Sequence, residues 1–284
     1  MGEGGTGERG PFDLLVCPLC GGVLRPAGAS LRCADRHTFD VARQGYAGLL
    51  TGDMRVGSAD TASMVEARES FLRAGHYAPL ARRLAALAAP LCPPGGAVLD
   101  AGVGTGYYLA ALLDAVPGAA GLGLDASKYA LRRAARAHPR AGAATWDVWR
   151  PLPVRDGAVD VLLNVFAPRN GPEFRRVTRP GGALVVVTPN ARHLAELRDR
   201  MGTLSVDADK EERLRRTLAD HFGPEHTETL EYPLTLPARD VRNAVAMGPS
   251  SHHLGAGEAA RRAELLEGSL EVTASFTLSV HRPL

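Results

Sequence analysis

The sequence has no long run of apolar residues. No stretch approaches the ~18 apolar residues of a membrane-spanning helix, and the Gly-rich, polar N-terminus has no signal-peptide core. We therefore expect a cytoplasmic protein that does not enter a membrane. Residues 1–12 are expected to be disordered.

Lysine is nearly absent, and neither sign of charge is in excess. Lys128 and Lys210 are the only lysines among 33 basic residues, and the formal net charge is +2. The chain is not a polycation, so any contact with nucleic acid must come from a local patch. Arginine carries nearly all the positive charge, and its guanidinium binds phosphate in a bidentate fork.

Cysteine is scarce too, but three of the four cysteines lie within the first 33 residues. Cys17, Cys20, Cys33 and His37 form a Cys-x2-Cys pattern followed by Cys-x3-His. Tetrahedral zinc takes four nitrogen or sulfur ligands, and two short turns with this spacing supply them. The segment has few apolar residues, so metal binding would stabilise it. We predict a structural zinc finger at residues 13–50, able to fold apart from the rest.

Two helices are predicted in residues 51–94, which we interpret as a helical linker. The first is capped by Asp60 or Thr61 and ends at Gly75. The second begins near Pro79, which suits a first helical turn. Its leucines at helical spacing indicate a buried face rather than a functional one.

A glycine loop follows the next predicted strand. The apolar run from Ala97 ends in Asp100, and Gly102, Gly104 and Gly106 precede a helix-like pattern. Strand, glycine loop and helix open a doubly wound sheet, where ligands bind beyond the carboxyl ends of the strands. The spacing departs from Gly-x-Gly-x-x-Gly, which argues against a nicotinamide enzyme. An ordinary strand-to-helix turn is the alternative.

The predicted strand at residues 119–124 ends at Asp125. A carboxylate there suits a ribose diol. The alternative is a helix cap, a role that Ser127 is also able to fill. Further strands are predicted at 143–147, 159–165, 183–188, 227–236 and 275–280. The fold class is therefore α/β, a Rossmann-like doubly wound sheet of seven strands over residues 95–284. The turn-like segment 247–253 is expected to overhang the site.

Residues 97–188 resemble the class I S-adenosylmethionine (SAM) methyltransferases. With the finger and the linker, the whole chain resembles the RlmA-type 23S ribosomal RNA guanine-N1-methyltransferases, above all the actinobacterial enzymes associated with macrolide resistance. The motifs that carry the resemblance are Cys-Pro-Leu-Cys (17–20), His-Thr-Phe-Asp (37–40), Ala-Gly-His-Tyr (74–77), Gly-Leu-Asp-Ala-Ser-Lys (123–128), Thr-Pro-Asn-Ala-Arg-His-Leu (188–194) and Met-Gly-Pro (247–249).

The resemblance implies SAM and a structural zinc ion as cofactors, a 23S rRNA hairpin loop as partner, and a homodimer. It implies that Tyr77, His193 and the Gly104–Thr105 turn contact SAM, although the residues alone suggest packing for Tyr77 and a surface position for His193. The expected SAM site is therefore Tyr77, Asp100, Gly102, Gly104, Thr105, Gly106, Asp125 and His193.

Methylation at guanine N1 requires a proton acceptor or a group that stabilises charge at O6, because N1 carries a proton at neutral pH. The candidates near the end of the fourth strand are Asn164, Phe166 and Arg169. Asn164 is no base, but its amide is able to donate to O6 or to accept from an N–H. Asp147, at the end of the third strand, and Asp160 are the candidate carboxylates, and neither is clearly placed for the task.

Two other functions are consistent with parts of the sequence. A small-molecule SAM-dependent methyltransferase would share the glycine loop but needs no finger. A non-catalytic zinc-containing RNA-binding protein would share the finger but does not need an intact glycine loop with Asp125. We expect the finger to hold RNA and the glycine-loop domain to hold the methyl donor.

Overall fold

A mixed eight-stranded sheet forms the centre of the computed structural model, which describes residues 10–52, 59–201, 216–248 and 256–284. The strand order is β10-β11-β9-β8-β5-β6-β7-β4; β11 runs antiparallel to its two neighbours and the other pairings are parallel. The strands are β4 (Tyr46–Ala47), β5 (Ala97–Ala101), β6 (Ala120–Asp125), β7 (Ala141–Thr145), β8 (Val159–Val165), β9 (Thr178–Pro189), β10 (Phe222–Pro237) and β11 (Ser269–Pro283). Strands β5 to β11 confirm the predicted doubly wound sheet.

Apolar side chains on both sides of the strands bury the sheet. Along β8, Val161 and Leu163 belong to one apolar cluster, called here the first cluster, and Leu162 belongs to another, the second cluster. This alternation is what a strand requires. Every residue of β5 and β8 is buried. This explains why both strands read as continuous apolar runs in the sequence.

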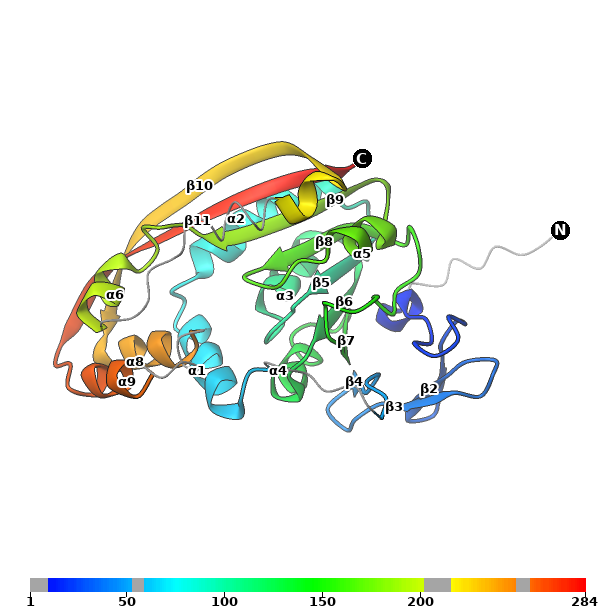
Figure 1. Cartoon of the computed structure of the whole chain (residues 1–284), viewed down its shortest axis with the longest axis horizontal. Helices are drawn as coiled ribbons and strands as arrows, with labels where there is room; N and C mark the ends of the chain where they lie inside the picture. Colours follow the sequence, from blue (N-terminus) through cyan, green and yellow to red (C-terminus); the bar gives the residue numbers. More distant parts are fainter. Residues whose placement is uncertain (1–9, 53–58, 202–215, 249–255) are drawn as a thin grey trace.

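Helices α1 to α4 pack with the first cluster, and α5 packs with the second (Figure 1). The helices are α1 (Ala62–Arg73), α2 (Ala78–Ala88), η2 (Ala89–Leu91), α3 (Tyr107–Ala115), α4 (Lys128–Ala134), α5 (Gly171–Val177), α6 (Ala195–Met201), α8 (Ala238–Ala246) and α9 (Ala256–Glu264). The Thr61 side chain accepts a hydrogen bond from the Met64 amide and caps α1, as predicted. Leu80 and Leu84 on α2 are fully buried, which confirms the predicted core face.

The antiparallel pair β10–β11 is longer than the sequence patterns predicted. The pair forms the edge of the sheet beyond β9, and one end of it lies beside α6, α8 and α9, at the opposite end of the molecule from the finger (Figure 1). Because α8 and α1 also pack together, the C-terminal region covers the helical linker.

The finger consists of η1 (Pro11–Leu14), β1 (Arg25–Ala27), β2 (Ser30–Arg32) and β3 (Thr38–Asp40). Its core residues Leu14, Leu31 and Phe39 belong to the same cluster as Leu122 of β6 and Trp146, which directly follows β7. Strand β4, which follows it, pairs with β7 as an eighth strand of the main sheet. Because so short a segment completes its core against the sheet, we expect that the finger does not fold apart from it, in contrast to the prediction from the sequence.

The N-terminus also differs from the prediction. Pro11 and Phe12 were expected to be disordered, but they open η1, and Phe12 packs against the second apolar cluster. Residues 1–9 lie outside the described part of the chain, as do residues 249–253 of the segment expected to overhang the site.

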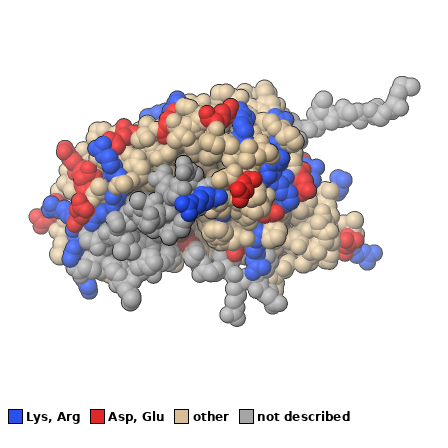
Figure 2. Space-filling view, turned by 45° about the horizontal axis from the view of Figure 1, so that its top comes forward, with Lys and Arg blue, Asp and Glu red and all other residues tan. Residues whose placement is uncertain are grey.

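Charged side chains of both signs are mixed over the face shown in Figure 2, in keeping with the net charge of +2. None of the helices in the described ranges is long and apolar enough to cross a membrane.

Candidate functional site

Four side chains of the finger converge on one point. One ligand atom each from Cys17, Cys20, Cys33 and His37 lies within 4.8 Å of the others. The Cys20 and Cys33 sulfurs are 3.7 Å apart, and His37 Nδ1 lies 3.5 Å from the Cys17 sulfur and 3.4 Å from that of Cys33. A tetrahedral zinc ion would require about 3.8 Å between sulfurs and about 3.6 Å between sulfur and nitrogen. The donor set therefore fits zinc, with no position left open for water.

Backbone hydrogen bonds within the two finger turns orient these four side chains. The Gly21 amide donates to the Cys17 carbonyl, and the Cys17 amide donates to the Gly22 carbonyl. Gly21 has a φ of +72°, a left-handed conformation that glycine adopts without strain. In the second turn the Cys33 amide donates to the His37 carbonyl, which closes the Cys-x3-His loop.

The glycine loop lies at the carboxyl end of β5. Gly102, Gly104 and Gly106 all have positive φ. A Cβ on Gly102 would lie 2.3 Å from the Cβ of Ala167, so a side chain there would displace the segment after β8. At Gly104 the nearest atom to such a Cβ is Nη1 of Arg68, at 3.9 Å, which is an ordinary van der Waals contact with a flexible side chain, so the loop is less crowded there than at Gly102. This less crowded side is where a ligand is able to approach the loop.

Asp125 joins the ends of β5 and β6. Its Oδ2 accepts a hydrogen bond from the Gly104 amide (2.8 Å), and its Oδ1 accepts one from the Ser127 amide (2.8 Å). The Ser127 hydroxyl caps α4 by accepting from the Ala130 amide. Burial raises the pKa of Asp125, while the two amides lower it. Each carboxylate oxygen has a second lone pair, so Asp125 retains capacity to accept from the hydroxyls of a ribose.

Asp100 has a buried carboxylate oxygen, Oδ1, with no hydrogen-bond partner among the described residues. The residue is 1% exposed and is the last but one residue of β5, next to the loop. Burial, with a smaller contribution from Asp125, raises the pKa of its carboxyl to about 8. A buried acceptor without a partner is costly, so this position fits the positively charged part of a ligand.

Tyr77 and His193, which are 116 positions apart, share a hydrogen bond of 2.9 Å. The backbone amide of Ser275 donates to His193 Nδ1, so this nitrogen carries no proton. Burial lowers the pKa of His193 to about 3, which keeps the ring neutral. The proton is therefore on Nε2, which donates to the Tyr77 oxygen. The Tyr77 hydroxyl proton is then available to a ligand.

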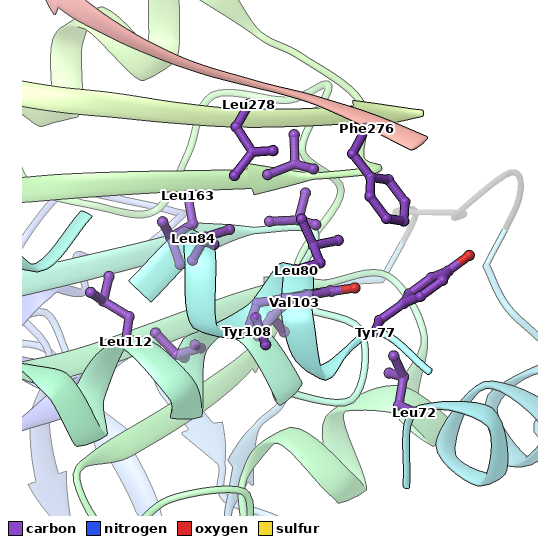
Figure 3. Packing of buried hydrophobic residues seen from close by; sticks show 14 of the residues in the cluster. Leu72, Tyr77, Leu80, Leu84, Val103, Tyr108, Leu112, Leu163, Phe276 and Leu278 are labelled. Atoms are coloured by element: carbon purple, nitrogen blue, oxygen red, sulfur yellow. The ribbon is translucent and has the colours of Figure 1, made fainter. Parts of the chain in front are cut away.

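An aromatic cluster surrounds this pair. Phe276 contacts Tyr77 edge to face at 5.1 Å and lies above it in Figure 3. Phe166 lies 6.4 Å from Tyr77, 6.2 Å from Tyr108 and 5.6 Å from Phe276 between ring centroids. It is 43% exposed and has a φ of +55°, which is strained for a bulky residue. Backbone strain of this kind clusters at ligand sites.

The remaining catalytic candidates differ in where they lie. Asn164 is fully buried; its amide donates to the carbonyls of Ala101 and Pro168, and its oxygen accepts from Arg169. It therefore holds the loops after β5 and β8 together and faces no open space. Asp160 accepts from the Ala97 amide at the amino end of β5, the wrong edge of the sheet for substrate.

Asp147 is partly exposed at the carboxyl edge, where its Oδ1 accepts a hydrogen bond from the Trp149 amide. Of the candidates, Phe166 and Asp147 are thus the two that reach a surface at the correct edge. The ring contacts of Phe166 are with other aromatic side chains, so the geometry does not single out a proton acceptor.

Sequence reasoning missed Arg68 of α1 as a site residue. Arg68 forms an ion pair with Asp60 and donates to the Met247 carbonyl, while the carbonyl of Asp60 accepts from the Ser127 hydroxyl. Arg68 thus connects the linker, the end of α8 and the glycine loop. No local sequence pattern predicts such a contact, because the residues that make it are far apart in the sequence.

A groove of about 1230 Å³ is lined by α1, α2, α3, the α4 region and the finger turn at Arg43 and Gln44. Alanines form much of its wall. Because Thr105 of the glycine loop is one of the lining residues, the groove reaches that loop. Two carboxylates, Glu69 and Asp114, face six arginines: Arg43, Arg73, Arg82, Arg132, Arg133 and Arg136. Glu69 pairs with Arg73 and Arg133. Within the described ranges no ion pair is seen for the other four. The groove therefore carries excess positive charge.

Two family models match the chain. Residues 15–53 match the zinc ribbon described as "RlmA, N-terminal", and residues 98–182 match "Methyltransferase domain". These are the segments that hold the four-ligand cluster and the glycine loop.

Three relatives cover most of the chain. A Streptomyces fradiae protein named "23S rRNA (guanine(748)-N(1))-methyltransferase" is 52% identical over 95% of this chain and 97% of its own length. A Micromonospora griseorubida protein, named provisionally as a 23S rRNA (guanine-N(1)-)-methyltransferase, has the same identity and coverage. A Bacillus subtilis protein with the same provisional name is 36% identical over 68% of this chain and 70% of its own.

Proposed function

Because the chain belongs to the family of 23S rRNA (guanine-N1-)methyltransferases, we propose that it transfers the methyl group of SAM to N1 of a guanine in 23S ribosomal RNA. One observation carries the proposal. The similarity to the two relatives at 52% identity runs through both the zinc cluster and the glycine loop, across 95% of the chain. A small-molecule methyltransferase would need only the second of these.

SAM would be held at the carboxyl ends of β5 and β6 and supplies the methyl group. The backbone at Gly104 and Thr105 would lie against it, Asp125 would accept from its ribose hydroxyls, and Asp100 would face its positive charge. Tyr77, oriented by His193, would donate one hydrogen bond to it. Methyl transfer is an in-line displacement, so correct positioning supplies much of the rate.

Phe166 would form the floor on which the target guanine lies. Its exposed ring is held from behind by Tyr77, Tyr108 and Phe276. Guanine N1 is on the Watson–Crick edge, so the base must be unpaired and turned out of any stack. This requirement supports a hairpin loop as the target. Asp147 remains our candidate proton acceptor, since it has the partly exposed carboxylate near this edge.

The arginine-lined groove would hold the phosphate backbone of the RNA. Phosphate contacts position an RNA without reading its sequence. The groove combines Arg43 of the finger region with arginines of α1, α2 and the α4 region. It therefore supports RNA binding by the finger and the helices together.

The decisive experiment incubates the protein with labelled SAM and fragments of unmodified 23S rRNA, and then maps the label. We expect one methylated guanine, detected as a primer-extension stop because a methyl at N1 blocks pairing. Phe166→Ala should abolish the stop while SAM still binds. Labelling of a base other than guanine, or no labelling of any RNA with SAM bound, would overturn the proposal.

The proposal extends to three features that rest on the resemblance. The protein would act as a homodimer, which analytical ultracentrifugation tests. It would act in the cytoplasm, where ribosomal RNA is made. Methylation would raise macrolide resistance. Expression of the protein in a macrolide-sensitive host tests this, because it should raise the minimal inhibitory concentration of the macrolide.

A further inference from the structure

Trp149 is one of two tryptophans in the chain, and the two lie in opposite environments. Trp146 is 3% exposed and belongs to the second apolar cluster. Trp149, three residues later, is 63% exposed. A single exposed apolar side chain needs no functional explanation, so the question is whether the structure holds this one in place.

Four hydrogen bonds fasten the segment that carries Trp149. The Asn170 amide nitrogen donates to the carbonyls on both sides of it, Val148 (3.0 Å) and Arg150 (3.3 Å). Asp147 Oδ1 accepts from the Trp149 amide (3.1 Å), and the Trp146 indole donates to the Pro151 carbonyl (3.1 Å). The backbone at Trp149 is therefore fixed while its ring points to solvent. A ring presented in this way loses little conformational entropy when a partner stacks on it.

The same contacts connect Trp149 to the candidate substrate site. Asn170 lies four positions after Phe166, in the segment that follows β8. Trp149 lies in the segment that follows β7, and both segments leave the sheet at its carboxyl edge because the strands run parallel. Among the described residues, Trp149 and Phe166 are the two large aromatic side chains counted as exposed.

The chemistry around Trp149 favours a nucleobase over a protein. Its neighbours Asp147 and Arg150 are charged, so the ring belongs to no broad apolar patch. Aromatic rings stack on unpaired bases irrespective of sequence, and each such contact contributes substantially to binding. An adjacent guanidinium such as that of Arg150 suits the phosphate of the same nucleotide.

We propose that Trp149 is a second stacking platform, which holds an unpaired base of the RNA loop next to the target guanine. This inference rests on the proposed function. Phe166 would take the guanine to be methylated, and Trp149 would take a neighbouring base. Trp149 is thus a positioning residue that fixes the loop relative to the methyl donor.

Tryptophan fluorescence tests the proposal directly, because Trp149 is the solvent-exposed one of the two emitters. An unmodified 23S rRNA fragment that contains the target hairpin should quench the part of the emission that comes from Trp149. In the Trp149→Phe variant this part of the emission, and with it the quenching, should be absent. Trp149→Ala should weaken RNA binding about tenfold or more, whereas Trp149→Phe, which keeps a ring, should lose less. The affinity for SAM should not change in either variant.

Leu265→Ala is a matched control, since Leu265 is 81% exposed on another part of the surface. It should leave RNA binding unchanged. If Trp149→Ala binds the fragment within twofold of the wild type, or if RNA does not alter the emission of Trp149, the platform does not exist. Those results would still leave guanine methylation by the wild type intact, so failure of this inference and failure of the proposed function are distinguishable.

Discussion

At the scale of the residue, Asp100 is a buried carboxyl group whose Oδ1 has no hydrogen-bond partner in the described part of the chain. Burial raises its pKa to about 8. At pH 7 the carboxyl of the protein without SAM is therefore mostly protonated. It must release this proton before it is able to pair with a cation.

We accordingly expect SAM to bind more tightly as the pH rises from 6 to 8 and to reach a plateau above pH 8. Binding at pH 7 should release protons, which calorimetry in buffers of different ionisation enthalpy detects. Asp100→Asn should bind SAM with little dependence on pH in this range. A wild-type affinity that stays constant between pH 6 and 8 would show that Asp100 does not face the charge.

Asp125 is predicted to bind the SAM ribose. Asp125→Ala should weaken SAM binding by about 1.5–3 kcal/mol, the range for a hydrogen bond to a charged group. It also removes the acceptor for the Gly104 and Ser127 amides. Ser127→Ala is the matched control, because it removes the α4 cap and costs about 0.5–2 kcal/mol of stability but keeps the carboxylate. Calorimetry that finds equal SAM affinity for Asp125→Ala and wild type would refute the assignment.

At the scale of elements, the zinc finger and the sheet stabilise one another. Cys33→Ser should release zinc, as measured by mass spectrometry of the purified protein. Because Leu31 and Phe39 share a core with Leu122 and Trp146, the loss should also lower the melting temperature of the whole protein. Cys92→Ala, which alters a thiol outside the cluster, should keep its zinc. A zinc-free variant that melts at the wild-type temperature would mean that the two cores are independent.

The α4 region contributes half of the arginines that line the groove. Replacing Arg132 and Arg136 by Gln together should weaken RNA binding and flatten its salt dependence, by a slope of about 0.7 for each lost contact with single-stranded RNA. Replacing Arg175 and Arg200, which lie on α5 and α6, removes the same charge away from the groove and should leave the slope unchanged. Equal slopes in the two double variants would exclude the groove from the RNA path.

At the scale of the whole molecule, the finger is part of the catalytic fold. A chain that begins at Ala59 would lose β4 from the sheet edge, the Leu49 amide that donates to Thr145, and the apolar cover of Leu122 and Trp146. We expect it to aggregate or to unfold without a cooperative transition, as size-exclusion chromatography and circular dichroism would show. If instead it folds and binds SAM as tightly as the full chain, the shared core is not required for the catalytic fold.

Local signals in the sequence determined the fold class and the metal ligands. Buried parallel strands read as apolar runs, and glycines mark the turn after β5. Thr61 and Ser127, each one of two candidate caps in the sequence, cap α1 and α4. The four zinc ligands lie within 21 residues of one another, so their spacing alone places them together. Each of these features depends on interactions over a few turns of chain.

Only the tertiary structure decided how the site is assembled. Tyr77 and His193 meet across 116 positions, and Arg68 reaches the Met247 carbonyl across 179. Asn164 was a candidate donor in the sequence, but long-range contacts bury it. The attachment of the finger to the sheet likewise depends on which apolar faces remain uncovered after the sheet has formed. Periodicity and spacing do not specify such contacts, because they arise only when distant segments pack against each other.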